Sequence, residues 1–410
     1  MSTDRYLVGI DVGTTKVCTV VGVEGPTGKL AILGYGLRPS QGLRKGSVVN
    51  IADARLAIRS SIEEAADQAG VRITSALVGV TGSHIQCRNT KTAWESSHND
   101  DPISSHDLEE LISATTRMDV GSDRELLHVI PRSYVLDRHT EVRNPLGMHA
   151  TRLDIETHVV TGALGPIDNL VQAIGKAGVK VRRLVLEPLA SAEAVLTPEE
   201  RELGVVLVDM GGGTTDISIF QKGTVWHTSI IPVGGVQMTN DLSSGLGLSS
   251  TEAEQLKVTQ GTVQPEKLDQ EETVKTATFG KASVEISRSD VSQILTDRCS
   301  ELLQLVLHRI GQAGLETLPP SGIVFTGGCA ALPGLEALAH QIVPGRVRIG
   351  APSDLDGAGS ALEHPAFATS VGILLWEIRH HPQWNRRSAG YRNGSTHKPF
   401  GRLLTALGRG

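Results

Sequence analysis

The sequence is poor in aromatic residues and in cysteine. Aromatic side chains make up 3% of the 410 residues, so valine, leucine, isoleucine and alanine must form most of the hydrophobic core. The cysteines are far apart and form no CxxC pair: Cys18, Cys87, Cys299 and Cys329. This spacing argues against a disulfide framework or a zinc site and is consistent with a reducing compartment.

Three sequence signals are also missing. No apolar run reaches the ~18 residues that a membrane-spanning helix needs. The first residues show no charged segment followed by an apolar one, as a signal peptide would. The pattern GxxxxGK[ST] is absent, which excludes a P-loop nucleotide site. We therefore expect a protein that is located in the cytoplasm.

Acidic residues are absent after Glu377, where seven arginines and lysines follow. Because the net charge is −6, the chain before this basic tail must be strongly acidic. An acidic body argues against a nucleic-acid-binding core, and the basic tail predicts a separate interaction.

Glycine, in contrast, is abundant, with 45 residues. Residues 6–23 predict two strands around a Gly-Thr turn, and residues 205–220 repeat this scheme in VVLVDMGGGTTDISIF. A chain of 410 residues exceeds what one hydrophobic core usually serves. We therefore interpret the repeat as a duplication that gives two related lobes.

Three glycine-containing turns follow apolar strands and are suited to binding phosphate. Glycine lets backbone N–H groups approach an anion closely, and threonine hydroxyls add donors. The third turn is expected to lead into a helix, whose N-terminus favours negative charge. Any one turn alone would be an ordinary hairpin, but the duplication with an aspartate at each strand end favours a site. The candidates are Gly13, Thr14, Thr15, Lys16, Gly211, Gly212, Gly213, Thr214, Gly327 and Gly328.

The motifs IDVGTTK, VVLVDMGGGTTDISIF and GIVFTGGCAALPGL resemble the two phosphate motifs and the adenosine motif of the actin, sugar-kinase and chaperone ATPase superfamily. EPLASAEAVL and FATSVGILLW are similar to its two connecting motifs, and all five stand in the expected order. The resemblance implies an α/β fold of the actin-like, ribonuclease H-like duplicated type. It also implies that ATP and Mg²⁺ bind between the lobes.

The same resemblance implies roles for single residues. Glu187, Asp11 and Asp209 would be the catalytic residues, with Glu187 orienting the attacking water. Asp11 and Asp209 would also hold Mg²⁺, mostly through water. Three more residues join the nucleotide-binding candidates: Gly235, Glu254 and Lys257. Without the resemblance, Glu187 is equally well explained as an N-terminal helix carboxylate, and the pair on the helix after residue 250 as a solvated face.

Residues 84–162 indicate which family of this superfamily the chain resembles. HVIPRSYVLD and NPLGMHATRLDIETHVVTG closely resemble the inserted subdomain of the FtsA family of actin-like bacterial cell-division proteins. GLRKGSVVNI and VGGVQMTNDLSSGLGLSSTEAEQLK match the same family. The resemblance implies a protein that binds ATP, hydrolyses it slowly at most and self-associates into filaments. It would anchor FtsZ, whose C-terminal peptide would bind at 239–290, to the inner face of the cell membrane at the division site and recruit later divisome proteins.

The apolar periodicity of residues 51–69 predicts a helix. Within 84–162, the polar stretch SSHNDDPISSHD is expected to open a helix, and LLHVIPRSYVLD and DIETHVVTG predict strands.

The expected domain organisation has four folded parts, a linker and a terminal helix. They are the first lobe (1–83 and 163–203), the inserted subdomain (84–162), the second lobe (204–238 and 291–380), a small subdomain (239–290), a flexible linker (381–397) and an amphipathic helix (398–410).

The last segment, KPFGRLLTALGRG, predicts a helix that lies in a membrane interface. Its apolar residues fall within one stripe about 100° wide, and most basic residues lie opposite. The membrane-binding candidates are Phe400, Arg402, Leu403, Leu404 and Leu407. A terminal helix packed on its own domain is the alternative.

Two other functions stay open at this point. A pilus-assembly platform protein of the same fold would bind an inner-membrane pilus peptide. A small-molecule kinase of the same superfamily would transfer a phosphoryl group to a metabolite. The basic tail favours the cell-division function over both.

Overall fold

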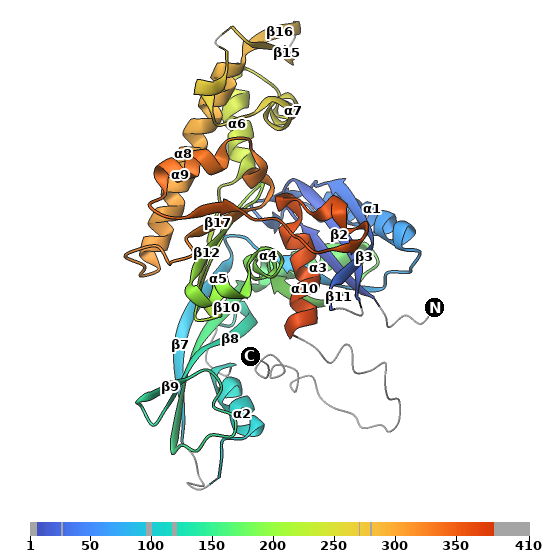
Figure 1. The fold of residues 1–410 in the computed structure, drawn as a ribbon. Helices are drawn as coiled ribbons and strands as arrows, with labels where there is room; N and C mark the ends of the chain where they lie inside the picture. The colour runs from blue at the N-terminus through green and yellow to red at the C-terminus, as the bar shows by residue number, and fades with distance from the viewer. Residues whose placement is uncertain are drawn as a thin grey trace.

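The computed structural model describes residues 6–25, 28–95, 101–116, 121–269, 271–278 and 281–380. Two sheets side by side form the middle of the molecule, and two smaller parts project from it in opposite directions (Figure 1). The predicted linker 381–397 and helix 398–410 lie outside the described residues.

The first sheet has the strand order β11-β6-β1-β2-β3-β19. Its strands are β1 (Leu7–Val12), β2 (Lys16–Glu24), β3 (Leu30–Pro39), β6 (Ser75–Val80), β11 (Lys180–Leu186) and β19 (Asp356–Gly357). Strand β1 is antiparallel to β2 and parallel to β6. A short hairpin of β4 (Leu43–Arg44) and β5 (Ser47–Val48) follows β3.

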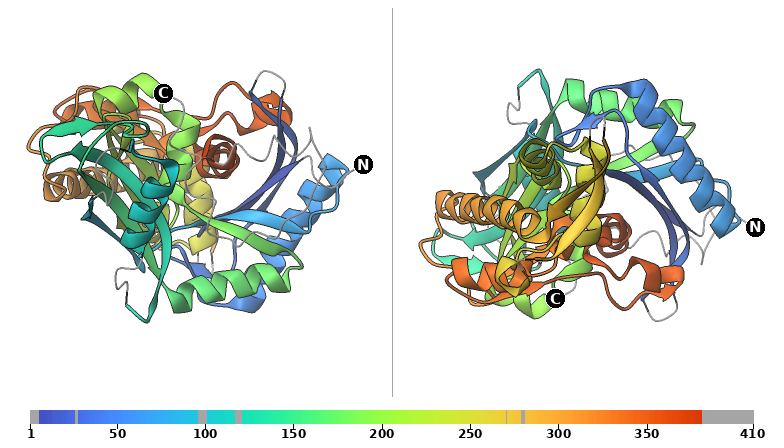
Figure 2. Two further views of the ribbon diagram at one scale, coloured as in Figure 1. Left: turned by 90° about the horizontal axis from the view of Figure 1, so that it is seen from below. Right: turned by 90° about the horizontal axis from the view of Figure 1, so that it is seen from above.

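Helices cover both faces of this sheet, which explains why its strands are nearly continuous apolar runs. Helices α1 (Ile51–Ala69) and α3 (Leu164–Lys176) pack on one face, and α10 (Ala368–His380) packs on the other (Figure 2). Helix α1 has the bounds that its apolar periodicity predicts. Asn50 caps its first N–H groups, and Gly70 ends it in a left-handed conformation with φ 63°.

The second sheet repeats the first, with the order β14-β13-β12-β17-β18. Its strands are β12 (Val205–Met210), β13 (Thr215–Gln221), β14 (Thr224–Ile231), β17 (Ile323–Thr326) and β18 (Val347–Ile349). Strand β12 is antiparallel to β13 and parallel to β17, as β1 is to β2 and β6. The predicted duplication is therefore confirmed.

Helices also cover the second sheet on both faces. One face packs on α6 (Gly235–Leu246), α8 (Arg288–Gln312) and α9 (Leu335–Ile342). The other packs on α4 (Glu187–Val195) and α5 (Pro198–Leu203). Helices α6 and α8 extend away from the second sheet, and three further elements lie at their far ends (Figure 1). These are α7 (Ser250–Gln260), the 3-10 turn Pro265–Lys267 and the hairpin of β15 (Thr273–Thr278) and β16 (Lys281–Ser287).

The end of the described chain returns to the first sheet. Strand β19 pairs with β3, and Val371 and Leu374 of α10 pack against Leu7 and Cys18. The 3-10 turns Ala358–Leu362 and Pro365–Phe367 connect them. The prediction had assigned this segment to the second lobe, because sequence order alone does not show on which sheet an apolar helix packs.

Helices α4 and α10 cross between the two lobes in direct backbone contact. A Cβ atom on Gly372 would overlap with the Ala190 carbonyl oxygen, so glycine alone permits this approach. The two connecting helices therefore form one packed unit at the junction of the lobes.

Residues 85–163 form a separate four-stranded sheet with the order β7-β10-β8-β9. Its elements are β7 (Ile85–Glu95), α2 (Ser105–Thr116), β8 (Arg124–Leu136), β9 (Thr140–Val142) and β10 (Arg152–Ala163). The sequence predicted the helix and the regions of β8 and β10. Strand β7 was missed, because most of its side chains are polar and it lies at a sheet edge.

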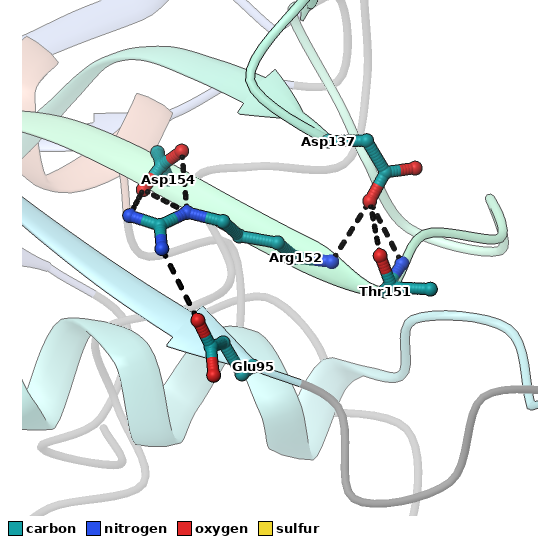
Figure 3. A network of polar contacts seen from close by, with 5 residues as sticks. All are labelled: Glu95, Asp137, Thr151, Arg152 and Asp154. Atoms are coloured by element: carbon teal, nitrogen blue, oxygen red, sulfur yellow. Dashed lines mark hydrogen bonds and ion pairs between the residues drawn. The ribbon is translucent and has the colours of Figure 1, made fainter.

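The far end of this sheet is held by a network of polar contacts (Figure 3). The Asp137 carboxylate accepts hydrogen bonds from the backbone N–H groups of Thr151 and Arg152. The Arg152 guanidinium in turn bonds to Asp154 and Glu95. These contacts join β7, β10 and the loop after β8. They therefore hold the strands together at the end of the sheet that lies farthest from the two lobes.

Candidate nucleotide site between the lobes

A cavity of about 120 Å³ lies between the turns that open the two sheets. It brings together three glycine turns that are far apart in the sequence. All ten predicted phosphate-binding residues line it, as do the three predicted catalytic residues: Asp11, Gly13, Thr14, Thr15, Lys16, Glu187, Asp209, Gly211, Gly212, Gly213, Thr214, Gly327 and Gly328.

The first two turns have the same local geometry. The Gly13 N–H donates to the Lys16 carbonyl (3.0 Å), and the Gly211 N–H donates to the Thr214 carbonyl (2.9 Å). The turns also touch each other across the cavity. A Cβ atom on Gly213 would overlap with the hydroxyl of Thr14. Glycine is thus required here for close packing between lobes as well as for an exposed backbone.

The third turn differs from the prediction. Gly327 has φ 88°, and a Cβ atom there would overlap with the Asp209 carboxylate. After it comes a 3-10 turn, Gly328–Ala331, and helix α9 begins only at Leu335. The predicted helix N-terminus directly after the turn is therefore wrong, because the run CAALPGL contains a proline and a glycine that delay the helix.

Hydroxyl groups from the connecting helices orient the two strand-end aspartates. Asp209 accepts hydrogen bonds from Ser191 on α4 (2.5 Å) and from Thr369 on α10 (3.0 Å). Asp11 accepts one from Ser370 on α10 (2.8 Å). The sequence prediction missed these hydroxyls, although they stand in the two connecting motifs that it quoted.

The lining carboxylates exceed the basic charge beside them. Burial and the neighbouring Asp11 raise the pKa of Glu187 well above its usual value. Burial and Asp209 raise the pKa of Asp216 to about 8. Among the residues that the structure describes, Lys16 is the one lysine or arginine that lines the cavity. Burial alone would lower the pKa of Lys16, but Asp11 and the other carboxylates raise it. Such an excess of buried carboxylate favours a cation.

A hydrogen bond crosses between the lobes at the floor of the cavity. The Thr81 hydroxyl, just after β6, donates to the Asp216 carboxylate on β13 at 2.7 Å. Both residues line the cavity, and both were missed. The only local signal was the position of Asp216 directly after the GGGTT turn.

Comparison with known proteins agrees with this geometry. A sequence profile described as "Cell division protein FtsA" matches residues 206–372, and one described as "SHS2 domain inserted in FTSA" matches residues 82–161. The chain is 36% identical over 406 residues to the cell division protein FtsA of Pseudomonas aeruginosa, covering 99% of this chain and 97% of that protein. The chain belongs to the FtsA family.

Solved structures show the fold of this FtsA-family chain independently. The PilM–PilN type IV pilus biogenesis complex matches with a TM-score of 0.66 at 16% identity, over 91% of this chain and 98% of that one. MreB 5 of Spiroplasma citri, bound to AMPPNP, matches with a TM-score of 0.55 at 14% identity, over 95% and 99%. A profile of the Hsp70 protein matches residues 168–226. The predicted family and the actin-like fold are confirmed.

No group of three or more potential metal ligands lies close enough to hold an ion directly, within the described part of this FtsA-family chain. Asp11 and Asp209 both line the cavity, and hydroxyl groups fix their carboxylates. This arrangement fits a hydrated Mg²⁺, which keeps several waters and uses few carboxylates.

The remaining nucleotide candidates lie together but outside the cavity. The Lys257 ammonium donates to the Gly235 carbonyl (3.0 Å) and to Glu254 (2.7 Å). Gly235 itself donates to the carbonyl of Gly211 (3.0 Å). The group therefore stands directly behind the second phosphate turn, on α6 and α7.

The short β4–β5 hairpin, part of the GLRKGSVVNI segment that matches the FtsA family, also reaches the cavity. Gly46 lines it and donates its N–H to the Thr14 hydroxyl at 3.2 Å. Lys45 and Gly46 both have positive φ (49° and 76°), as a tight hairpin turn requires. This contact was not predicted.

No helix in the described ranges combines the length and the apolar content that crossing a bilayer requires. The membrane-binding candidates at 400–407 lie outside those ranges.

Proposed function

We propose that this FtsA-family protein binds ATP with Mg²⁺ between its lobes, self-associates, and anchors the FtsZ ring to the inner face of the cell membrane. Later divisome proteins would be recruited to the same assembly. The observation that supports the nucleotide site is the pair of matching turns, each preceded by a buried aspartate, which face each other across one cavity.

In the proposed complex, backbone N–H groups of the first two turns and the hydroxyls of Thr14 and Thr15 bind the phosphates. Lys16 adds a point charge, and Asp11 and Asp209 orient the water shell of the metal ion. When bound, Mg²⁺ supplies positive charge that neutralises phosphate oxygens. Residues 235–257 lie on the side from which base and ribose would approach.

The lobes must separate slightly for a nucleotide to enter. The cavity measures about 120 Å³, whereas sites for small ligands usually exceed ~300 Å³. The two turns also touch, with Gly213 against Thr14 and Gly212 against Thr15. Nucleotide binding is therefore proposed to begin with an opening of the lobes.

Hydrolysis in this site is proposed to be slow. Glu187 lines the cavity, and burial and the neighbouring Asp11 raise the pKa of its carboxyl group. Because two further carboxylates beside it disfavour its charged form, it is not arranged as a dedicated general base. Nucleotide would then act mainly on the conformation and assembly of the protein.

Two smaller parts are proposed to carry the partner contacts. Residues 239–290, which include most of α6, all of α7 and the β15–β16 hairpin, would receive the FtsZ C-terminal peptide. The inserted subdomain, 84–162, would take part in contacts between copies of the chain. Both assignments rest on membership of the FtsA family.

The basic C-terminal segment is proposed to be the membrane anchor. Burying one phenylalanine and three leucines would stabilise binding by at most ~6–12 kcal/mol. Ordering a short helix offsets much of this, and basic residues near anionic lipid add about 1 kcal/mol each. A single tail would therefore bind reversibly, and an assembly with many tails would bind firmly.

The nucleotide site is tested with Asp209→Ala. We expect Mg-dependent affinity for ATP to fall by at least tenfold, because the carboxylate that orients the metal's water is lost. Glu109→Ala on α2, an exposed carboxylate far from the cavity, is the matched control and should bind normally. Isothermal titration with and without Mg²⁺ measures both. Unchanged affinity of the Asp209 variant would count against the assignment.

The cell-division role is tested by capture of FtsZ. Full-length FtsZ should be retained by the immobilised protein, and FtsZ without its C-terminal peptide should not. Retention of both forms would place the contact elsewhere. Retention of neither, with capture of a pilus peptide, would favour the platform function.

A further inference from the structure

The inserted sheet is covalently part of the first lobe. Strand β7 starts at Ile85, shortly after β6 ends at Val80, and β10 continues directly into α3. At this base the Arg124 guanidinium donates to the His84 carbonyl (2.9 Å) and to the Thr161 hydroxyl (2.9 Å). The sheet would be expected to move with the first lobe.

Its side chains, however, pack on strand β14 of the second lobe. The Arg132 guanidinium lies over the ring of Trp226, 3.6 Å from its centroid, and forms an ion pair with Glu156 at 2.7 Å. The Thr224 hydroxyl donates to the Pro131 carbonyl at 2.9 Å. Arg132 has only 3% of its side chain exposed, so this contact excludes solvent.

A chain of hydrogen bonds, buried at His158 and exposed at Asn89, continues the contact. His158 on β10 is fully buried, with Nδ1 2.8 Å from Asn89 Oδ1 and Nε2 2.8 Å from the hydroxyl of Thr228. The Asn89 amide group donates to the Trp226 carbonyl (3.3 Å), so its oxygen must accept the proton on His158 Nδ1. His158 Nε2 then accepts the proton of the Thr228 hydroxyl, whose oxygen also lies 2.7 Å from the Sγ atom of Cys87 on β7. Burial lowers the pKa of His158 to about 3.

These contacts form what we call the seam: Asn89, Arg132 and His158 of the inserted sheet with Trp226 and Thr228 of the second lobe. Strand β8 is also held at its other end by the first lobe. The Leu186 N–H donates to His128 Nε2 at 3.0 Å, and the His128 ring lies edge-on to Trp376. One strand is thus attached to both lobes, at points about 13 Å apart along its length.

Two stretches of chain, 81–89 and 216–228, carry the cavity floor and three of the five seam residues: Asn89, Trp226 and Thr228. The other two, Arg132 and His158, are on β8 and β10, which pair with each other. Thr81, which bonds to Asp216 across the cavity, lies in the loop that leads into β7. Asp216 is on β13, where it pairs with Ile230 of β14. Any opening that separates Thr81 from Asp216 therefore pulls β7 and β8 away from β14.

We propose that the inserted sheet is a brace between the two lobes, and that the seam sets how readily the cavity opens. Its effect on nucleotide exchange rests on the proposed function, whereas its effect on lobe opening does not. The strands run from the inserted subdomain into the centre of the molecule, as a brace must (Figure 1).

The test compares hydrogen exchange in the full-length protein without nucleotide. Thr228→Val keeps the shape of the side chain and removes the hydroxyl that His158 needs. It should raise amide exchange at least fivefold along 224–231 and also at the cavity floor, in 211–216 and 79–83. Asn89→Ala is a second variant. The position is exposed and therefore tolerates substitution more easily, and amide exchange should rise in the same segments.

Two controls separate the seam from general loosening. Tyr134→Phe alters the core of the inserted subdomain without touching the seam, and Lys222→Ala removes an exposed ion pair at its rim. Both should leave the cavity floor unchanged. Increased exchange confined to the seam in both seam variants would overturn the brace.

A second measurement follows release of a fluorescent ATP analogue. Dissociation should be at least threefold faster for Thr228→Val than for wild type, and unchanged for Tyr134→Phe. If the Thr228 variant binds the analogue and releases it at the wild-type rate, the seam does not control nucleotide exchange. Failure of the wild-type protein to bind the analogue would overturn the proposed function, and hydrogen exchange would still decide the brace.

Discussion

Asp216 illustrates how a single buried carboxyl group shapes the cavity. It accepts a hydrogen bond from Thr81 of the other lobe and lies near Asp209. Burial, together with Asp209, raises the pKa of Asp216 to about 8, whereas an aspartate in the unfolded chain has a pKa of ~3.9. The folded state therefore binds one more proton than the unfolded state between these values. The contribution of Asp216 to the free energy of unfolding therefore decreases as the pH rises from about 4 to 8.

Asp216→Asn should remove this pH dependence. The amide oxygen still accepts from Thr81, and no ionisation is possible. We expect the variant to be more stable than wild type at pH 8 by roughly 1–3 kcal/mol, and similar at pH 5. Thermal unfolding at both pH values measures this. An equal shift at the two pH values would show that the carboxyl group is not protonated in the folded state.

Among the secondary-structure elements, the crossed helices α4 and α10 control the geometry of the site. They supply the hydroxyls of Ser191, Thr369 and Ser370 to the two aspartates. Their backbones touch at Gly372 and Ala190. A shift of either helix would therefore misplace both carboxylates at once.

Gly372→Ala should force the two helices apart. We expect a loss of roughly 1–3 kcal/mol of stability, as for overpacking of a well-packed core. Gly175→Ala on α3 is the matched control, because nothing lies within 4 Å of the added methyl group. It should be neutral or slightly stabilising. Thermal unfolding compares the two, and equal midpoints would mean that the crossing is not tightly packed.

At the scale of the whole molecule, four parts are arranged around one junction. The two sheets meet at the cavity, the inserted sheet spans from the first to the second, and α6–α8 carry the opposite projection (Figure 1). The cavity lies between the turns that open the two sheets, and one projection extends from each lobe. Under the proposed function, a nucleotide-dependent movement of the lobes would move both projections.

The proposed tail anchor is tested on the whole protein. Removing 398–410, or making Leu403→Glu, should abolish sedimentation with anionic liposomes, while ATP binding is unchanged. Thr405→Glu makes the same charge change on the polar side of the predicted helix and should weaken sedimentation only in part. Equal losses for the two glutamate variants would show attraction by charge alone, without insertion of the apolar face.

Local motifs were predicted well because each one forms within a short stretch of chain. A strand, a tight turn and a second strand occupy residues 7–24 and again 205–221, so the apolar runs and the Gly-Thr turns were enough to find both hairpins. The same holds for α1, whose capping residues Asn50 and Gly70 adjoin its periodic pattern. These features depend on backbone preferences and on neighbouring residues.

Contacts between distant segments could not be predicted in this way. Nothing near residue 81 indicates a partner at 216, and the packing of α10 on the first sheet is invisible in its own apolar pattern. The amino-acid sequence by itself was therefore enough to identify the family and the candidate site residues. Only the tertiary structure decided that the inserted sheet packs on β14 of the second lobe, and which hydroxyls hold Asp11 and Asp209. These contacts join residues that are far apart in the chain, so only folding brings their atoms within bonding distance.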